Sequence, residues 1–262
     1  MKNFLIYICF FLLGATQLYG QNEVGTELVG RWAAGPPYAF TVENNIVFTA
    51  SGGILQTLDI SDPSNPILIG QVATNGIIND VAKSGNYIYL AEGDSGLKII
   101  DVTNLTNPVQ VNEYLQSYPI LKFKVENQTL FITEGKYDES QWTGGLRILD
   151  ISDPISPQPL GFFASSRPSY FISPVDNYIY MSYSSDETFI IDVSDLTIPI
   201  LAGSIYTRFG YSYLSGNLLY VAGNYPTDEG LKIFDVSNPS SPILLSHTIF
   251  PGCAEDINLV IH

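Results

Sequence analysis

The stretch that decides the fold is Gly145-Leu146-Arg147-Ile148-Leu149-Asp150-Ile151-Ser152-Asp153-Pro154, because the chain contains five variants of it. Aligned on the aspartate, the variants are centred on Asp59, Asp101, Asp150, Asp192 and Asp235. The intervals between these aspartates are 42, 49, 42 and 43 residues. A period of this length indicates a repeat architecture, in which each repeat is one unit of packed secondary structure.

Each repeat combines a turn with short apolar segments. Ser or Thr and then Asp or Asn follow two and three residues after the aspartate, and all five copies have proline seven residues after it: Pro66, Pro108, Pro157, Pro199 and Pro242. Short polar side chains bond back to the backbone and proline fixes φ, so this pattern is typical of a turn. The apolar runs on both sides, such as residues 97–100 and 67–70, are short and rich in β-branched residues, which predicts strands.

Two more strand-like segments precede this pair in every repeat. One is aromatic and begins after a polar turn, as at residues 86–89, and the other lies before that turn. Four strands, here called a to d, in a unit of about 42 residues correspond to one blade of a β-propeller. The sequence therefore predicts an all-β propeller with five complete blades, over residues 38–72, 78–115, 120–163, 170–205 and 211–249.

The repeated core, Leu/Ile-x-Ile-Ile/Leu-Asp-Val/Ile-Ser, resembles the LVIVD repeat, which forms propellers in bacterial and archaeal surface or secreted proteins. The resemblance extends over nearly everything after residue 20. It implies the propeller fold and no particular reaction. The fourth repeat departs from the pattern, with Glu187-Thr188-Phe189 where three other copies have Gly-Leu-Lys/Arg.

The first 20 residues have the layout of a secretory signal peptide: a lysine, an apolar run from Phe4 to Leu13, and a more polar end. The apolar run is too short to span a bilayer comfortably, and no later stretch approaches 18 apolar residues. We therefore expect one propeller domain over residues 21–262, located outside the cell, at the cell surface or in the periplasm.

The two ends of the chain supply parts of a closing blade. Residues 26–32 match strand d, and residues 255–260 are expected to form strand a of a sixth blade whose strands b and c are missing. A propeller has to close, because an open one exposes two sheet edges. Either the sequence is the front part of a longer protein, or five blades close with an irregular sixth position; we favour a truncated sequence.

Composition excludes several classes of function. The formal net charge is −15, which repels phosphate backbones and argues against a nucleic-acid partner. The histidines are His247 and His262, so a Ser-His-Asp or Cys-His arrangement has no plausible base, and zinc sites built from His and Cys are excluded by number. We expect no enzymatic activity and no cofactor.

A binding site is expected where the blades differ. In a propeller blade the b–c and d–a connections lie on one face, here called the variable face, and the a–b and c–d turns lie on the other. The c–d turns are near-identical, whereas the other connections vary and include a predicted loop from Gly135 to Gly144. Loops on a rigid scaffold are where binding residues gather. The candidate residues are Tyr118, Tyr137, Asp138, Trp142, Arg167, Tyr170, Arg208, Tyr211 and Tyr225.

Each candidate also has a structural interpretation. The tyrosines fit between blades with their hydroxyls in water, and Trp142 either contacts a ligand or covers its own loop. The arginines either hold a ligand carboxylate or pair with a nearby acid. Calcium is the one ion considered, because Asp94, Asp228 and Glu229 place oxygen ligands in these loops, although no Asp-x-Asp-x-Asp-Gly loop is present.

Three functions remain open. The leading hypothesis is a secreted or surface-displayed, non-catalytic propeller that binds a protein or a carbohydrate through its variable face. The second is a carboxylate-dependent glycoside hydrolase, which needs two acids across a cleft and would use Asp94, Asp138 or Asp228. The third is a purely structural module of a larger surface protein.

Overall fold

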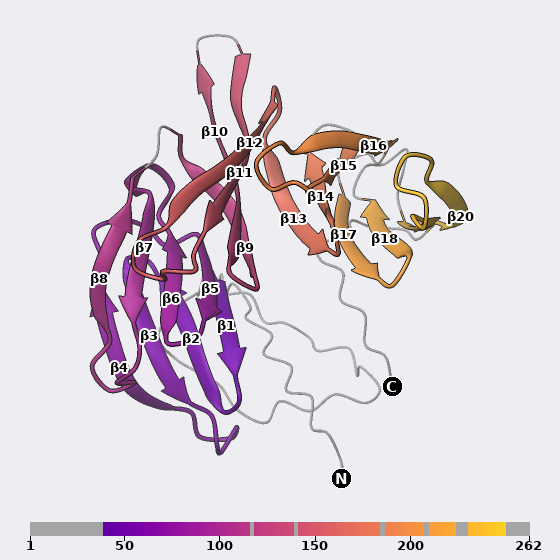
Figure 1. Ribbon diagram of the computed structural model, residues 1–262. Coiled ribbons are helices and arrows are strands. Elements are labelled where there is room, and N and C mark those ends of the chain that lie inside the picture. The colour runs from indigo at the N-terminus through magenta and orange to yellow at the C-terminus, as the bar shows by residue number, and fades with distance from the viewer. Residues whose placement is uncertain are drawn as a thin grey trace.

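The computed structural model describes residues 39–115, 118–138, 141–183, 187–206, 210–223 and 230–249 (Figure 1), which form twenty strands and one three-residue 3₁₀ turn, η1 (Gly93–Ser95). Blade 1 contains β1 (Ala39–Glu43), β2 (Ile46–Ser51), β3 (Ile54–Asp59) and β4 (Ile67–Ala73). Blade 2 contains β5 (Asp80–Ser84), β6 (Tyr87–Ala91), β7 (Leu97–Asp101) and β8 (Val109–Tyr114). Blade 3 contains β9 (Ile120–Glu126), β10 (Thr129–Asp138), β11 (Gln141–Asp150) and β12 (Gln158–Ser165).

Blade 4 contains β13 (Ser169–Val175), β14 (Tyr178–Tyr183), β15 (Glu187–Asp192) and β16 (Ile200–Tyr206). Blade 5 contains β17 (Gly210–Ser215), β18 (Leu218–Gly223), β19 (Gly230–Asp235) and β20 (Ile243–Thr248). Within each blade, strands adjacent in sequence pair antiparallel, so the blade is a four-stranded meander. The prediction of five complete four-stranded blades is confirmed.

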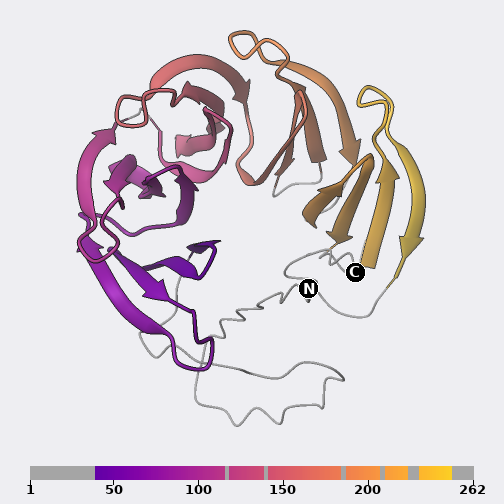
Figure 2. The ribbon, with the colours of Figure 1, turned by 60° about the horizontal axis from the view of Figure 1, so that its bottom comes forward.

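The blades are arranged around a common centre (Figure 2), with the first strand of each blade innermost and the last strand outermost. The inner strands contact one another in series: β1 with β5, β5 with β9, β9 with β13, and β13 with β17. In the part of the chain that the structure describes, Figure 2 shows the ring open between blade 5 and blade 1. The strands predicted at residues 26–32 and 255–260 lie outside the described residues.

Apolar clusters between adjacent blades form the core. Between blades 2 and 3, for example, Tyr89 and Ile99 pack against Phe123 and Leu130. Similar clusters join blades 1 and 2, blades 3 and 4, and blades 4 and 5. Strands b and c, such as β2, β6 and β7, bury side chains on both faces, which is why the sequence shows nearly continuous apolar runs in them.

The repeated aspartate closes the c–d turn. Asp101 Oδ1 accepts a hydrogen bond of 2.7 Å from the backbone N–H of Thr103, and the other four aspartates accept the same bond. The backbone N–H of Val102, between Asp101 and Thr103, donates to Asn86 O in the a–b turn at 2.9 Å. The side-chain hydroxyl and the backbone N–H of Thr103 lower the pKa of Asp101. These aspartates are structural, as five copies of one residue suggest.

The c–d turns of blades 2 to 5 also pack against the preceding blade, and in three cases a glycine makes this possible. A Cβ atom on Gly161 would stand 2.1 Å from the carbonyl oxygen of Leu196 in the next blade, and the corresponding glycines Gly70 and Gly203 are equally close to a neighbouring carbonyl. Blade 2 has Asn112 at this position, and its amide donates a hydrogen bond to Ile155 O. In blades 1 to 4 this position is therefore either glycine or a residue that bonds to the next turn, and blade 5 has Ser246 there.

The predicted loop from Gly135 to Gly144 is wrong. Strand β10 extends to Asp138 and β11 begins at Gln141, with Tyr137 opposite Trp142, and Figure 1 shows this strand pair projecting beyond the neighbouring blades. The glycines there do not signal a loop, because the backbones approach closely: a Cβ atom on Gly144 would stand 2.1 Å from Glu134 O. Glycine inside a strand can mark such an approach.

Candidate functional site

The variable face is formed by two kinds of connection. One joins the second and third strands of each blade, such as β2 and β3, and the other joins one blade to the next. Strands a begin at this face and strands b end there, because the four strands of each blade alternate in direction. Strands β10 and β11 are the longest strands among the described residues, and their hairpin extends from this face (Figure 1). Several large apolar side chains are exposed on the variable face, among them Ile77, Leu115 and Ile249.

The hairpin places two of the predicted residues opposite each other, with different exposure. Tyr137 is 69% exposed, whereas Trp142 is half-buried and lies against its partner strand. A Cβ atom on Gly135 would stand 2.4 Å from Trp142 Cζ2, so the glycine leaves room for the indole ring. Trp142 Nε1 is buried without a hydrogen-bond partner. Trp142 therefore packs over its own hairpin. Asp138 is the last residue of β10, and the structure describes its backbone only.

The start of blade 4 gathers polar and aromatic side chains. Arg167 Nη1 lies 3.5 Å from Glu187 Oε2, and Ser204 Oγ donates a hydrogen bond of 3.1 Å to the other carboxylate oxygen. Tyr206 stands opposite Glu187 across the β15–β16 pair and is 58% exposed. Tyr170, at the start of β13, is 54% exposed. Arg167 therefore pairs with an acid of this chain, beside two exposed tyrosines.

In the described part of the structure, the other predicted residues do not lie together. Tyr118 is half-buried just before β9, and Tyr211 is placed in β17 by its backbone. Asp94 is exposed in η1. Arg208, Tyr225, Asp228 and Glu229 lie outside the described residues. Within the described ranges, no three His, Cys, Asp or Glu side chains gather as a metal centre.

Two buried glutamates were missed by the sequence reasoning. Glu134 is at the end of the regular part of β10, and its side chain is fully buried beside Arg147. Arg147 Nε donates to both carboxylate oxygens at 2.9 Å, and Nη2 donates to Oε1 at 2.5 Å. The guanidinium also lies 4.8 Å from the centroid of Phe162. The hydrogen bonds to Glu134 raise the pKa of Arg147 further, so the guanidinium stays protonated.

Glu92 has the same position in the repeat. Like Glu134 it comes six residues after the polar residue that opens strand b, and comparing the repeats with each other would have found both. Glu92 is 3% exposed, and neither of its carboxylate oxygens has a hydrogen-bond partner. The position corresponding to Arg147 is Lys98, whose Nζ pairs with Glu113 at 2.6 Å instead.

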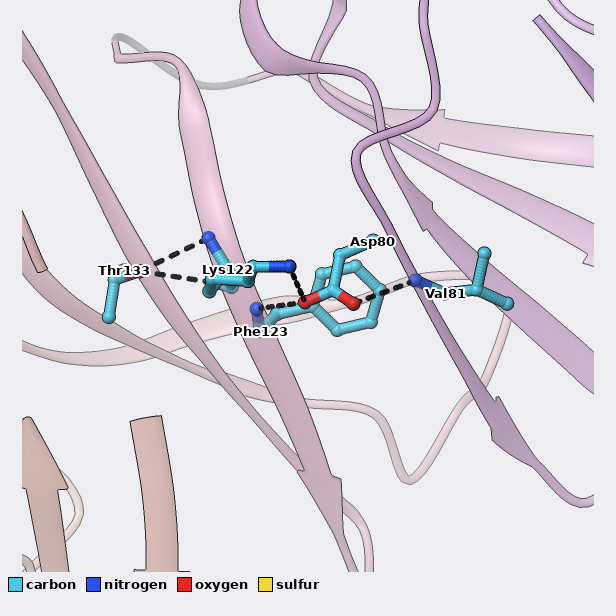
Figure 3. A network of polar contacts seen from close by, with 5 residues as sticks. All are labelled: Asp80, Val81, Lys122, Phe123 and Thr133. Carbon is cyan, nitrogen blue, oxygen red and sulfur yellow. Dashed lines mark hydrogen bonds and ion pairs between the residues drawn. The ribbon is translucent and has the colours of Figure 1, made fainter. Parts of the chain in front are cut away.

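The inner strands are joined by a polar network centred on Asp80 (Figure 3). Asp80 Oδ1 accepts the N–H of Val81 at 3.1 Å, and Oδ2 accepts the N–H of Phe123 in the next blade, also at 3.1 Å. Lys122 Nζ stands 3.9 Å from Oδ2. The carboxylate therefore satisfies a backbone donor of β9 that has no partner strand on that side, which links blades 2 and 3 at the centre of the ring.

The repeat itself decides the family. The LVIVD repeat matches residues 41–74, 75–116, 140–163, 172–207 and 213–248, which is more than half of the chain. The chain belongs to the LVIVD repeat family. The match confirms the resemblance of the repeated core to the LVIVD repeat and indicates no particular reaction. A search of curated proteins gives no significant match to this LVIVD chain.

Solved structures similar to the LVIVD chain share its fold at low sequence identity. The periplasmic gluconolactonase PpgL of Pseudomonas aeruginosa has a TM-score of 0.70 at 12% identity, over 87% of this chain and 76% of that one. The β-propeller domain of Cps50 (Swd1) from Myceliophteria thermophila has a TM-score of 0.63 at 10% identity, over 85% and 76%. BamB from Moraxella catarrhalis has a TM-score of 0.52 at 9% identity, over 85% and 78%. These similarities establish the β-propeller fold alone.

The described ranges contain no helix of the length and apolar character that a membrane span requires.

Proposed function

We propose that this LVIVD propeller is a non-catalytic binding protein that takes a protein or carbohydrate ligand on its variable face, outside the cytoplasm. One observation carries the proposal. The three tyrosines that are more than half exposed among the described residues, Tyr137, Tyr170 and Tyr206, all lie at the ends of strands that reach the variable face. Tyrosine offers a large apolar surface and a polar tip at low entropic cost, which suits both protein contacts and sugar stacking.

The surroundings of the tyrosines support a recognition surface. The Arg167–Glu187 pair and Ser204 provide hydrogen-bonding groups in the same blade as Tyr170 and Tyr206, with Glu187 opposite Tyr206. Tyr170 and Tyr206 both lie in strands of a packed blade, so the scaffold rather than a long loop holds them in place. The net charge of −15 favours ligands without phosphate backbones.

The test is binding by the full chain. A glycan array and a panel of purified extracellular proteins would be screened with wild type and with a triple variant carrying Tyr137→Ala, Tyr170→Ala and Tyr206→Ala. Exposed aromatic contacts at the centre of an interface cost ~1–2 kcal/mol or more each on truncation, so we expect the affinity to fall at least tenfold. The matched control is Ile198→Ala, an exposed residue of a c–d turn on the opposite face. Binding that survives the triple variant but not the control refutes the assignment.

The alternatives make different predictions. A carboxylate-dependent glycosidase would lose turnover and keep binding when Asp94, Asp138 or Asp228 is changed to Asn, and a propeller can host such chemistry. The solved gluconolactonase is an enzyme by name, which is the reason to include a hydrolase assay. If neither substitutions nor ligand screens change a measurable property, the chain is a structural module. N-terminal sequencing of the exported protein tests removal of residues 1–20.

A further inference from the structure

Glu92 is a buried carboxylate without a counterion. It follows β6, lies beneath the connection between β4 and β5, and is 3% exposed with both oxygens unpaired. Buried charges in proteins are normally paired or coordinate a metal, because removing a carboxylate from water is costly. A carboxylate buried in this way has the chemistry to hold a cation.

The next blade shows what the same repeat position requires. Glu134 is equally buried, and there the chain supplies the cation itself through three N–H···O contacts from Arg147. Blade 2 has Lys98 in place of Arg147, and its single ammonium group pairs with the more exposed Glu113. The contrast shows that the repeat tolerates a buried glutamate with a cation beside it, and that blade 2 has committed its internal cation elsewhere.

Oxygen atoms converge next to Glu92. A Cβ atom on Gly76 would stand 3.0 Å from Glu92 Oε2 and 2.9 Å from Ser95 Oγ, so both oxygens face the same space beside the glycine. The carboxylate of Asp94 is in the same 3₁₀ turn and reaches solvent. The side-chain amide of Asn79 borders this turn, since its Nδ2 would lie 3.3 Å from a Cβ atom on Gly93.

We infer that Glu92, Asp94 and Ser95 form a calcium site at the junction of blades 1 and 2 on the variable face. Carboxylate and hydroxyl oxygens are ligands for a hard cation, and Ca²⁺ accepts irregular loops more readily than Mg²⁺ does. Two carboxylates and neutral oxygens give a low ligand charge, which corresponds to the weak extracellular class of calcium sites, with Kd on the order of 0.1–1 mM. The inference is independent of the ligand proposed above, because calcium binding is measured on the protein alone.

The experiment is thermal unfolding and isothermal titration calorimetry of the full chain in EDTA and in CaCl₂ up to about 10 mM. A ligand that binds the folded state at 10 to 100 times its Kd raises the melting temperature of a protein of this size by roughly 3 to 10 °C. We expect this shift for wild type with one calcium bound. Glu92→Gln should abolish the shift, and in EDTA its melting temperature should equal or exceed that of wild type because the uncompensated charge is gone.

The controls separate binding from folding. Asp176→Asn removes one exposed acid in an a–b turn on the opposite face, where asparagine also accepts the positive φ, and should keep the full calcium shift. Ser95→Ala should weaken calcium affinity several-fold, and it serves as the second variant if Glu92→Gln does not fold. An unchanged wild-type melting temperature in calcium without a calorimetric signal overturns the inference. So does a shift of equal size in wild type and in either site variant.

Discussion

Removing the guanidinium of Arg147 tests how the repeat handles a buried acid. In the fold, Arg147 makes three N–H···O contacts to a carboxylate whose side chain is fully buried. Arg147→Met keeps most of the aliphatic stem but removes the guanidinium over Phe162 and leaves the Glu134 carboxylate without its partner. Breaking a buried pair in this way costs ~3–5 kcal/mol. For a protein of this size that corresponds to a melting temperature lower by roughly 6 to 20 °C.

The assay is urea unfolding at pH 7, with each variant compared by its midpoint and slope. Lys98→Met is the matched control, because it removes a cation at the same repeat position while its partner Glu113 can turn to water. That control should cost about 0–1 kcal/mol. Glu134→Gln combined with Arg147→Met should restore much of the stability, with a coupling energy of ~2–3 kcal/mol.

Three outcomes would refute this reasoning: a cost below ~1 kcal/mol for Arg147→Met, a cost equal to that of Lys98→Met, or additive effects in the double variant. Salt provides a further check, since a buried pair is screened little. A cost that disappears in 1 M NaCl would show that the Glu134 carboxylate is solvated.

The remaining predictions concern the contacts between repeats. Gly161→Ala places a methyl group against the carbonyl of Leu196 and should destabilise the protein by ~1–3 kcal/mol in urea unfolding; a neutral result would show that the blades are not in close contact. Tyr89→Phe loses the 3.1 Å hydrogen bond to Pro154 O, at a cost of ~1 kcal/mol. Burial raises the pKa of Tyr89 to about 12, so its stabilising effect is present below pH 10 and is lost as the pH rises toward 12; the variant should lose less stability over that range. The pKa of Asp101 is lowered in the fold, so its effect is present above about pH 4 and lost on acidification; melting curves of Asp101→Asn between pH 5 and pH 2 should fall less steeply, and parallel curves would contradict the role of its turn.

Much of the fold could be predicted because the turns and strands of each repeat depend on residues that are close together in the sequence. The turn after Asp101 depends on residues within a few positions, and its hydrogen bonds to Thr103 and Asn86 are formed inside one blade. Strand length and alternation are also local properties. The hairpin of β10 and β11 could not be predicted in this way, because its glycines signal a loop locally and permit close strand packing only when the partner strand is known.

The candidate site depended on the tertiary structure to a larger extent. The sequence placed Tyr137, Tyr170 and Arg167 on the variable face, and it could not decide that Arg167 pairs with Glu187 or that Trp142 lies against Gly135. These contacts depend on which side of a strand each residue faces and on how far neighbouring connections extend. Neither property is contained in a residue's own neighbourhood.

The sequence by itself determined the number of repeats, the strands and turns within each, and hence the propeller family. The tertiary structure decided which buried charges find a partner. Glu92 and Glu134 occupy equivalent positions in the sequence, yet Arg147 reaches Glu134 while Lys98 pairs with Glu113. The physical reason is that local hydrogen bonds define a blade. Whether a buried carboxylate has a counterion depends instead on whether a cationic side chain of another strand can reach it.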